Sequence, residues 1–136
     1  MQFIKLLLII ENQALRRSLA SLFARQANYR LVGEFGALII HKVQELQPDV
    51  VLYSLSGNDE KSLDPIRAIK EVCPCTMTIV ISPQCARTDV RKVFQAGAHS
   101  YLKTPLLPAD LILAVDLACR GEIFLLPGSS SYPGIS

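Results

Sequence analysis

Pro48-Asp49-Val50-Val51-Leu52-Tyr53-Ser54-Leu55 is the stretch that decides the fold of this chain. Its middle is apolar, a proline precedes it, and small and polar residues follow at 56–60. A short apolar run with turn residues on both sides is typical of a strand that is buried on both faces of a parallel sheet. In an open α/β sheet, ligands bind beyond the carboxyl ends of the strands. Ser54 lies at that end of the predicted strand, so we expect it to face the crevice of the fold.

The sequence before this strand changes twice between a strand pattern and a helix pattern. The apolar run 3–10 predicts a buried strand, and 29–34 predicts a shorter strand that at first alternates apolar and polar residues. Apolar residues three or four positions apart indicate two amphipathic helices. The apolar residues of the first helix are Leu15, Leu19, Leu22 and Phe23, and Asn12 is a candidate N-cap for it. Those of the second helix are Leu38, Ile39, Val43 and Leu46.

The sequence after this strand repeats the same alternation. Strands are predicted at 76–81 and, more weakly, at 99–102. Three helices are indicated by apolar residues at helical spacing. The first carries Leu63, Ile66, Ile69 and Val72, the second carries Val90, Val93 and Phe94 and ends at Gly97, and the third carries Leu107, Leu111, Ala114, Val115 and Ala118 and ends at Gly121. Five alternations of strand and helix predict a parallel sheet with helices on both faces. We assign residues 1–122 to one domain and 123–136 to a docked edge that leads into a flexible tail or linker.

Composition limits the classes of function. With 136 residues, of which 50% are apolar, and a net charge of +2, the chain favours one domain and gives no support for nucleic-acid or membrane binding by it. The apolar run near the N-terminus is too short for a signal peptide, so we expect a cytoplasmic protein. The histidines His41 and His99 and the cysteines Cys73, Cys75, Cys85 and Cys119 match no metal or redox spacing. We expect structural roles for the cysteines and surface or capping roles for the histidines.

Three further segments carry a resemblance to a known family. They are Ile9-Ile10-Glu11-Asn12-Gln13-Ala14-Leu15-Arg16, Gly97-Ala98-His99-Ser100-Tyr101-Leu102-Lys103-Thr104-Pro105 and Gly121-Glu122-Ile123-Phe124-Leu125-Leu126-Pro127. Together with the strand at 48–55, they resemble the receiver domain of two-component response regulators, in the branch whose receivers precede a helix-turn-helix DNA-binding domain. The resemblance implies a flavodoxin-like, doubly wound (βα)5 fold with a five-stranded parallel sheet in the order 2-1-3-4-5.

The chain departs from this family at the phosphorylation pocket. Ser54 stands where the resemblance implies a phosphate-accepting aspartate. Glu11 and Asn12 stand where it implies two acidic Mg²⁺ ligands, and Thr104 stands where it implies a lysine. Lys103 lies one position earlier, and one position along a strand reverses the direction of the side chain. A serine hydroxyl needs an adjacent base to become a nucleophile, and Mg²⁺ prefers charged oxygen ligands. We therefore expect a degenerate pocket without a catalytic residue, a metal or a cofactor.

The family's switch residues are retained in part. Ser82 matches the hydroxyl that moves toward the phosphoryl group, and Tyr101 matches the aromatic residue that reports this movement to the surface. The alternative interpretation is structural. In it, Ser82 only caps the region of the fourth helix, and Tyr101 is a half-buried aromatic residue that is prone to form interfaces. We expect the working surface on the fourth helix, fifth strand and fifth helix. Its candidate residues are Arg87, Arg91, Lys92, Tyr101 and Lys103.

The sequence thus predicts a pseudo-receiver that is not an enzyme. It would regulate by phosphorylation-independent contact with a protein partner or a second copy, as part of a transcription regulator whose DNA-binding domain is a separate module. The alternative is a stand-alone adaptor whose pocket binds a small ligand or a partner loop. An enzyme that uses Ser54 is disfavoured because neither histidine is placed by a motif to serve as its base.

Overall fold

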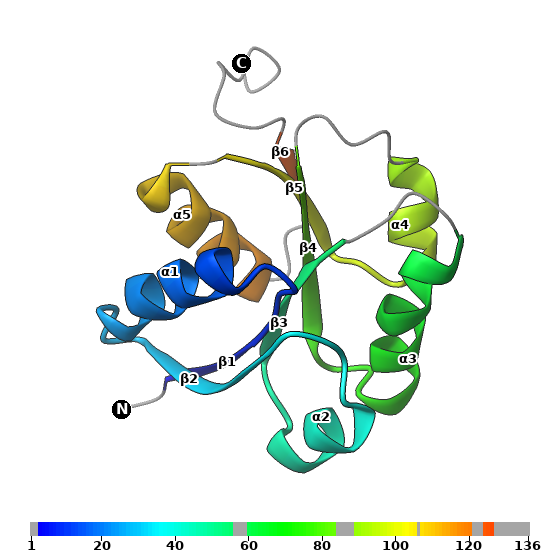
Figure 1. Ribbon diagram of the computed structural model, residues 1–136, viewed down its shortest axis with the longest axis horizontal. Helices are drawn as coiled ribbons and strands as arrows, with labels where there is room; N and C mark the ends of the chain where they lie inside the picture. The colour runs from blue at the N-terminus through cyan, green and yellow to red at the C-terminus, as the bar shows by residue number, and fades with distance from the viewer. Residues whose placement is uncertain (1–2, 56–59, 84–88, 106, 121–123, 127–136) are drawn as a thin grey trace.

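A parallel β-sheet with helices on both faces makes up the described part of the chain (Figure 1). The computed structural model describes residues 3–55, 60–83, 89–105, 107–120 and 124–126. The strands are β1 (Ile4–Ile9), β2 (Tyr29–Phe35), β3 (Val50–Ser54), β4 (Met77–Pro83), β5 (Ser100–Thr104) and β6 (Phe124–Leu126). The helices are α1 (Gln13–Ala24), α2 (Ile40–Leu46), the 3-10 helix η1 (Glu60–Leu63), α3 (Asp64–Val72), α4 (Val90–Ala96) and α5 (Pro108–Cys119). None of the described helices is long and apolar enough to cross a bilayer.

The strand order in the described sheet is β2-β1-β3-β4-β5-β6, and every neighbouring pair is parallel. The predicted order of the first five strands is confirmed. The docked edge expected from residue 123 adds a short sixth strand beside β5, in which Phe124 pairs with Ser100 and Leu126 pairs with Leu102. The sheet therefore continues past the domain boundary that we placed after residue 122. The rest of the predicted tail, 127–136, lies outside the described residues.

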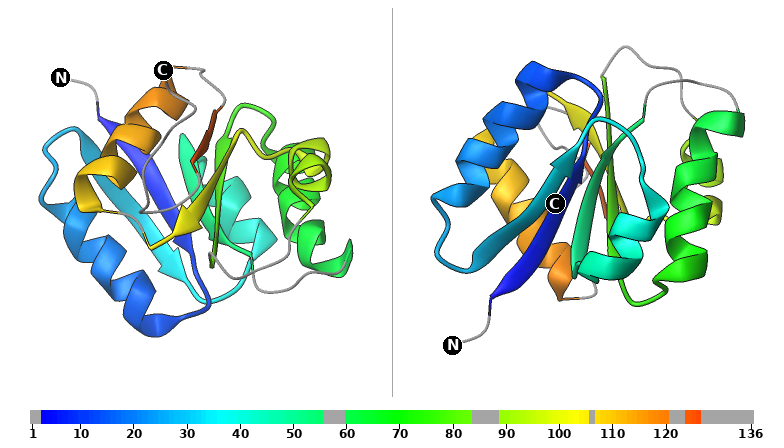
Figure 2. Two further views of the ribbon diagram at one scale, coloured as in Figure 1. Left: turned by 90° about the horizontal axis from the view of Figure 1, so that it is seen from above. Right: turned by 60° about the horizontal axis from the view of Figure 1, so that its bottom comes forward.

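Two apolar cores lie on opposite faces of the sheet, because successive side chains of a strand point to opposite sides. The core under α1 and α5 contains Leu6, Leu8, Val50 and Leu52, and the core under α2, α3 and α4 contains Leu7, Ile9, Val51 and Tyr53. Figure 2 shows α1 and α5 together on one side of the sheet, with α3 and α4 on the other. Burial of a leucine or isoleucine side chain contributes about 1.5–3 kcal/mol. Because β1 and β3 are covered on both faces, they fix the frame that the other strands join.

The amino end of β3 is fastened to both neighbouring strands through Asp49. Its carboxylate accepts a hydrogen bond from the Lys5 backbone N–H at 2.8 Å, and its own N–H donates to the Lys5 carbonyl at 2.9 Å. On the other side, the Met77 N–H donates to the Asp49 carbonyl at 2.9 Å. The Thr76 hydroxyl also donates to the Pro48 carbonyl at 2.7 Å. These bonds set the register of β1, β3 and β4, and so bring their carboxyl ends to one edge of the sheet.

Two predicted helix ends are confirmed by their geometry. The Asn12 side chain accepts a hydrogen bond from the Leu15 N–H at 2.9 Å and caps α1. Gly97 follows α4 with a φ of 127°, a conformation that side-chain-bearing residues rarely adopt. A Cβ atom on Gly97 would also lie 2.7 Å from a side-chain carbon of Lys70. The turn from α4 into β5 therefore requires glycine for two independent reasons.

His99 is a structural residue that joins β4 to β5. Its ring Nδ1 accepts a hydrogen bond from the Thr78 N–H at 3.1 Å, and its own N–H donates to the Thr78 carbonyl at 2.8 Å. The ring nitrogen can accept this bond only while it carries no proton. Burial, together with the nearby charge of Lys70, lowers the pKa of His99 from its usual value of 6.5.

We predict that His99 makes the stability of the protein dependent on pH. Because the pKa is lower in the folded state, the unfolded state binds more protons below pH 6.5. The contribution of His99 is therefore complete above that pH and is lost as the pH falls toward the folded-state pKa. Urea unfolding across this range should show a decline that His99→Asn reduces, since asparagine keeps an acceptor but does not titrate. An identical decline in His99→Asn would contradict the prediction.

Candidate functional site

A cavity of about 360 Å³ lies at the carboxyl ends of the central strands. It is lined by Glu11, Asn12, Leu15, Ser54, Leu55, Ile81, Ser82, Pro83 and Thr104. The five residues that the sequence assigned to a degenerate phosphorylation pocket are all among them. They come from four segments that are far apart in the sequence, and the parallel sheet brings them to one edge. Their convergence is a feature of the structure, whereas their role stays a prediction.

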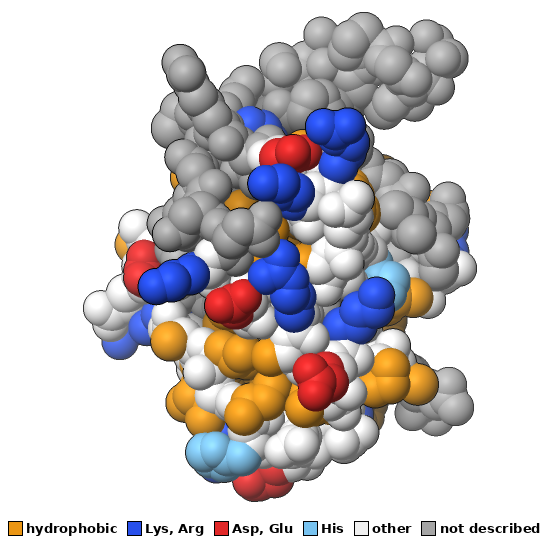
Figure 3. Space-filling view, turned by 90° about the vertical axis from the view of Figure 1, so that its right-hand side faces the viewer, with side chains coloured by type: hydrophobic (Ala, Val, Ile, Leu, Met, Phe, Trp, Pro, Cys, Tyr) orange, Lys and Arg blue, Asp and Glu red, His pale blue; other side chains and the backbone are white. Residues whose placement is uncertain are grey.

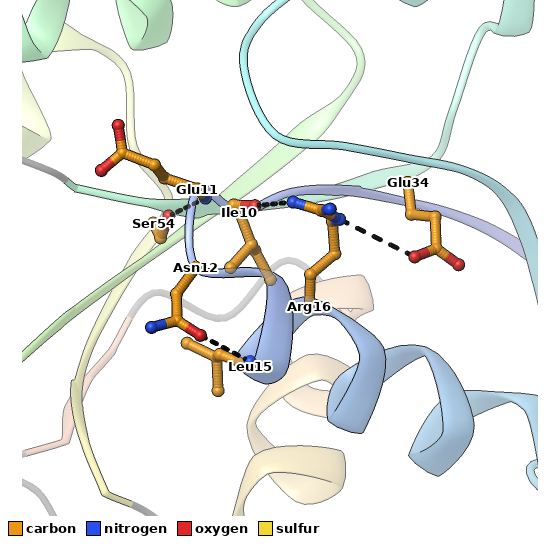
Figure 4. A network of polar contacts seen from close by, with 7 residues as sticks. All are labelled: Ile10, Glu11, Asn12, Leu15, Arg16, Glu34 and Ser54. Carbon is orange, nitrogen blue, oxygen red and sulfur yellow. Dashed lines mark hydrogen bonds and ion pairs between the residues drawn. The ribbon is translucent and has the colours of Figure 1, made fainter.

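The turn between β1 and α1 is held by a network of polar contacts (Figure 4). The Arg16 guanidinium donates a hydrogen bond to the Ile10 carbonyl at 2.7 Å. Its Nε atom lies 3.8 Å from a carboxylate oxygen of Glu34, at the end of β2. A cation therefore fastens the carbonyl end of β1 to its neighbouring strand. The sequence analysis named Arg16 only within the segment 9–16 that carries the family resemblance, and it missed this role.

Ser54 faces the cavity and is already engaged by the backbone. Its Oγ accepts a hydrogen bond from the Glu11 N–H at 3.1 Å (Figure 4). The side-chain oxygen of Asn12 is likewise occupied by the Leu15 N–H. Two of the pocket's oxygens thus satisfy backbone donors at the start of α1. Among the described lining residues there is no histidine or lysine that could deprotonate the Ser54 hydroxyl.

Ser82 and Thr104 lie on the other side of the cavity. The Thr104 hydroxyl donates a hydrogen bond to the Ser82 carbonyl at 3.3 Å. Ser82 is 2% exposed, and its Oγ atom has no hydrogen-bond partner among the described residues. Lys103 does not line the cavity, whereas Thr104 does. This agrees with the expectation that the side chain of Lys103 points away from the pocket.

Glu11 is the only charged residue among those that line the described cavity. Burial, and then the negative charge of Glu11, raises the pKa of the neighbouring Tyr53 to about 12. The Tyr53 hydroxyl stays protonated at neutral pH and donates a hydrogen bond to the Ser62 carbonyl at 3.1 Å. The exposed carboxylate of Glu11 thus adds a negative charge beside the cavity, which disfavours a bound anion.

The donor set of this cavity does not fit Mg²⁺, the metal that the receiver fold implies. Mg²⁺ sheds its water reluctantly and is usually held by one or two carboxylates together with substrate phosphate. Here the lining offers the single carboxylate of Glu11, while the oxygens of Asn12 and Ser54 already accept backbone hydrogen bonds. A cation at this position would gain one charged ligand, and it would share the two neutral oxygens with backbone N–H donors.

The predicted interface residues do not form one exposed set. Arg91 and Lys92 are exposed on α4, and the side chain of Arg91 is 89% exposed and lies 3.6 Å from Asp89. Figure 3 shows basic side chains mixed with acidic ones on the side of the molecule that α3 and α4 cover. Tyr101, however, is 0% exposed. The prediction that it is a half-buried interface residue was wrong, because it packs in the core under α3 and α4. Arg87 lies outside the described residues.

A second polar cluster, which the sequence analysis did not find, lies on the side of the sheet covered by α5. The Tyr29 hydroxyl donates a hydrogen bond to the Asp116 carboxylate. Burial raises the pKa of the nearby Cys119 thiol to about 11, so that the thiol stays protonated at neutral pH. Cys73 is buried and Cys75 is exposed, and all three are free thiols. The protonated state of Cys119 agrees with the structural role expected for it, while Cys85 lies outside the described residues.

Comparisons with known proteins support the resemblance. No family model matches the chain. The response regulator VraR of Staphylococcus aureus is 27% identical over 126 residues, which are 91% of this chain and 60% of VraR. The chemotaxis protein CheY of Thermotoga maritima is 26% identical over 114 residues, 82% of this chain and 95% of CheY. The chain thus spans about 60% of VraR but nearly the whole length of CheY.

Solved structures of response regulators share the fold. RcsB of Salmonella typhimurium has a TM-score of 0.79 at 18% identity, over 92% of this chain and 62% of that chain. The signal receiver domain of NarL from Mycobacterium tuberculosis has a TM-score of 0.78 at 19% identity, over 90% of this chain and 100% of that chain. The chain has the receiver-domain fold.

We predict that millimolar Mg²⁺ leaves the melting temperature of this receiver-like domain unchanged. A ligand that binds only the folded state raises stability by RT ln(1 + [L]/Kd), so a weakly bound ligand adds little. The described lining offers Mg²⁺ one charged ligand, so its affinity should be low. Calorimetric melts with and without Mg²⁺ measure the effect, with Ca²⁺ at the same ionic strength as a control for screening. A rise in melting temperature that is specific to Mg²⁺ and lost in Glu11→Ala would contradict this prediction.

Proposed function

We propose that this chain is a receiver-like signalling domain that regulates by protein contact without aspartyl phosphorylation. The observation that carries the proposal is Ser54 at the carboxyl end of β3, where the resemblance implies the phosphate-accepting aspartate. A serine phosphate ester cannot be formed there by the family's chemistry unless a base activates the hydroxyl. The described lining of the cavity supplies no histidine or lysine, and the contact between Glu11 and Ser54 is through the backbone N–H of Glu11.

The wider role that we propose is regulation of transcription in a longer protein. RcsB, of which the chain covers 62%, is described by its DNA interaction. A LuxR family DNA-binding response regulator from Silicibacter pomeroyi also shares the fold, with a TM-score of 0.69 at 21% identity. We propose a separate DNA-binding module as the output, with no nucleic-acid contact by this domain. The similarity to CheY along nearly its full length favours the second candidate, a stand-alone adaptor.

We predict that acetyl phosphate with Mg²⁺ adds no phosphate to this domain. Intact-mass spectrometry after incubation measures the outcome directly. Ser54→Asp alone should also stay unmodified, because Asn12 and Thr104 remain unsuited to Mg²⁺ and to a phosphoryl group. The triple variant Asn12→Asp, Ser54→Asp, Thr104→Lys is the matched control that restores the family pattern. A phosphate adduct on Ser54 of the parent would refute the proposal.

The contact surface that we propose includes α4 and the strand edge beside it. Arg91 and Lys92 are exposed there, and Leu107 and Leu113 of the α5 region are 60% and 54% exposed. Arginine and apolar residues are typical of interfaces. Because β6 pairs with β5, the surface between α4 and α5 includes β6 as well. Tyr101 lies beneath this surface and supports it from the core.

We predict that association through this surface weakens when its charge is reversed. Arg91→Glu with Lys92→Glu should lower the sedimentation mass, or abolish capture of a protein partner, with little change in melting temperature. Added salt should weaken the contact in the parent for the same electrostatic reason. Arg17→Glu, an exposed charge reversal on α1, is the control. If Arg17→Glu abolishes association and the α4 variant does not, the working surface is α1.

A further inference from the structure

We infer that the strand-end cavity binds a small amphiphile whose head donates hydrogen bonds and carries no negative charge, such as a primary amide or an alkylammonium ion. The inference rests on the proposed function, since it assigns a ligand to a pocket that no longer takes phosphate. It deepens that function by naming what the domain senses. Three observations carry it: a second cavity, an unpaired hydroxyl, and the charge of the lining.

The first observation is that an apolar cavity adjoins the polar one. A second cavity of about 350 Å³ is lined by Leu15, Leu19, Ile81, Thr104, Pro105 and Leu111. Leu15, Ile81 and Thr104 line both cavities. Thr104 is the one polar residue in the second lining, so its wall is almost entirely apolar. A polar chamber next to an apolar one fits a molecule with a polar head and a short hydrocarbon group.

The second observation is the unpaired hydroxyl of Ser82. Its residue is 2% exposed and lines the polar cavity, while Oγ has no partner among the described residues. A buried polar group without a partner is rare, because it loses its hydrogen bonds to water and gains none in return. A ligand head that bonds to Ser82 Oγ would restore the lost bond. We expect the head group to bind at this wall of the cavity, where a rotation of the Ser82 side chain would bring the buried Oγ to it.

The third observation is the sign of the charge. Glu11 is the only charged residue in either described lining, and no lysine, arginine or histidine occurs in them. The carboxylate attracts a cation or an N–H dipole and repels a phosphate or a carboxylate. The oxygens of Asn12 and Ser54 already accept backbone N–H bonds, so they add little attraction for a metal ion. The class of ligand that the lining favours is therefore an organic molecule whose head group carries N–H donors.

The size of the site limits the ligand. Each cavity lies near the lower end of the range of about 300–1,000 Å³ in which small-molecule sites are found. The polar chamber accommodates a head of a few atoms, and the apolar chamber accommodates a short chain between α1 and α5. Leu19 of α1 and Leu111 of α5 are among the residues that line that chamber. A long-chain lipid does not fit this description.

Three probes with the same chain and different heads test the inference: hexanamide, hexylammonium and hexanoate. Two-dimensional ¹H–¹⁵N NMR titration of the full chain reports binding residue by residue. Hexanamide or hexylammonium should shift the amide signals of Leu15, Ser82 and Thr104. Hexanoate should bind at least about tenfold more weakly, a difference of about 1.4 kcal/mol. Equal binding of all three probes, or no shift with any of them, would overturn the inference.

A matched pair of variants separates the site from general effects. Ser82→Ala should weaken binding of the preferred probe by about tenfold, and it should fold because it removes an unpaired buried hydroxyl. Ser100→Ala is the control, since Ser100 is also fully buried with an unpaired Oγ but lines neither cavity. Equal affinity in both variants would contradict the role of Ser82.

The same samples distinguish this inference from the proposed function. Intact mass after treatment with acetyl phosphate reports phosphorylation without reference to the probes. An adduct on Ser54 would refute the proposed function even if hexanamide binds. Absence of an adduct together with absence of probe binding would leave the proposed function standing and would refute the ligand site.

Discussion

The pairing of β1, β3 and β4 at their amino ends is the constraint on which the site depends. Asp49 fastens β3 to β1 through Lys5 and to β4 through Met77, so the three strands start in a fixed register. Because parallel strands of similar length then end together, Ser54 and Ser82 reach the same edge. The two apolar cores hold this arrangement, since slipping a strand by one residue would turn every side chain to the opposite face. The cavity is a consequence of register, and its chemistry is decided by the few residues at the strand ends.

The sequence predicted most of this framework because its signals are local. Apolar runs, helical spacing and the cap at Asn12 depend on neighbouring residues, and parallel order follows from their alternation. The strand-end rule predicted that Ser54 faces the crevice, and the family resemblance added Glu11, Ser82 and Thr104, which line the same cavity. The sequence did not show which elements would pack around β5. The pattern at 99–102 is weak, and three residues of β6 are too few to carry a periodic signal.

The error at Tyr101 has the same physical origin. Burial of a strand residue depends on what covers the strand, and that is a non-local property. Tyr101 packs with Val93 and Ala96 of α4, and β6 occupies the edge that β5 would otherwise expose. Likewise, the role of Arg16 depends on a carbonyl at the end of β1 and a carboxylate at the end of β2, which no spacing in the first helix reveals. The sequence located the residues of the pocket better than the residues of the surface.

The polar residues of the pocket also stabilise the fold. Neighbouring carboxylates repel one another and resist joint ionisation unless a cation lies between them. Here the positions implied to be acidic carry one carboxylate, and Ser54 and Asn12 bind the backbone of the first helical turn instead. Such a pocket needs no metal to offset repulsion. Substituting Asn12 and Ser54 by aspartate would introduce that repulsion, although aspartate caps a helix as well as asparagine does, so a gain in phosphorylation would be accompanied by a loss of stability from the repulsion. The present residues thus favour a rigid frame around Ser82, the one described lining group whose hydroxyl is left without a partner.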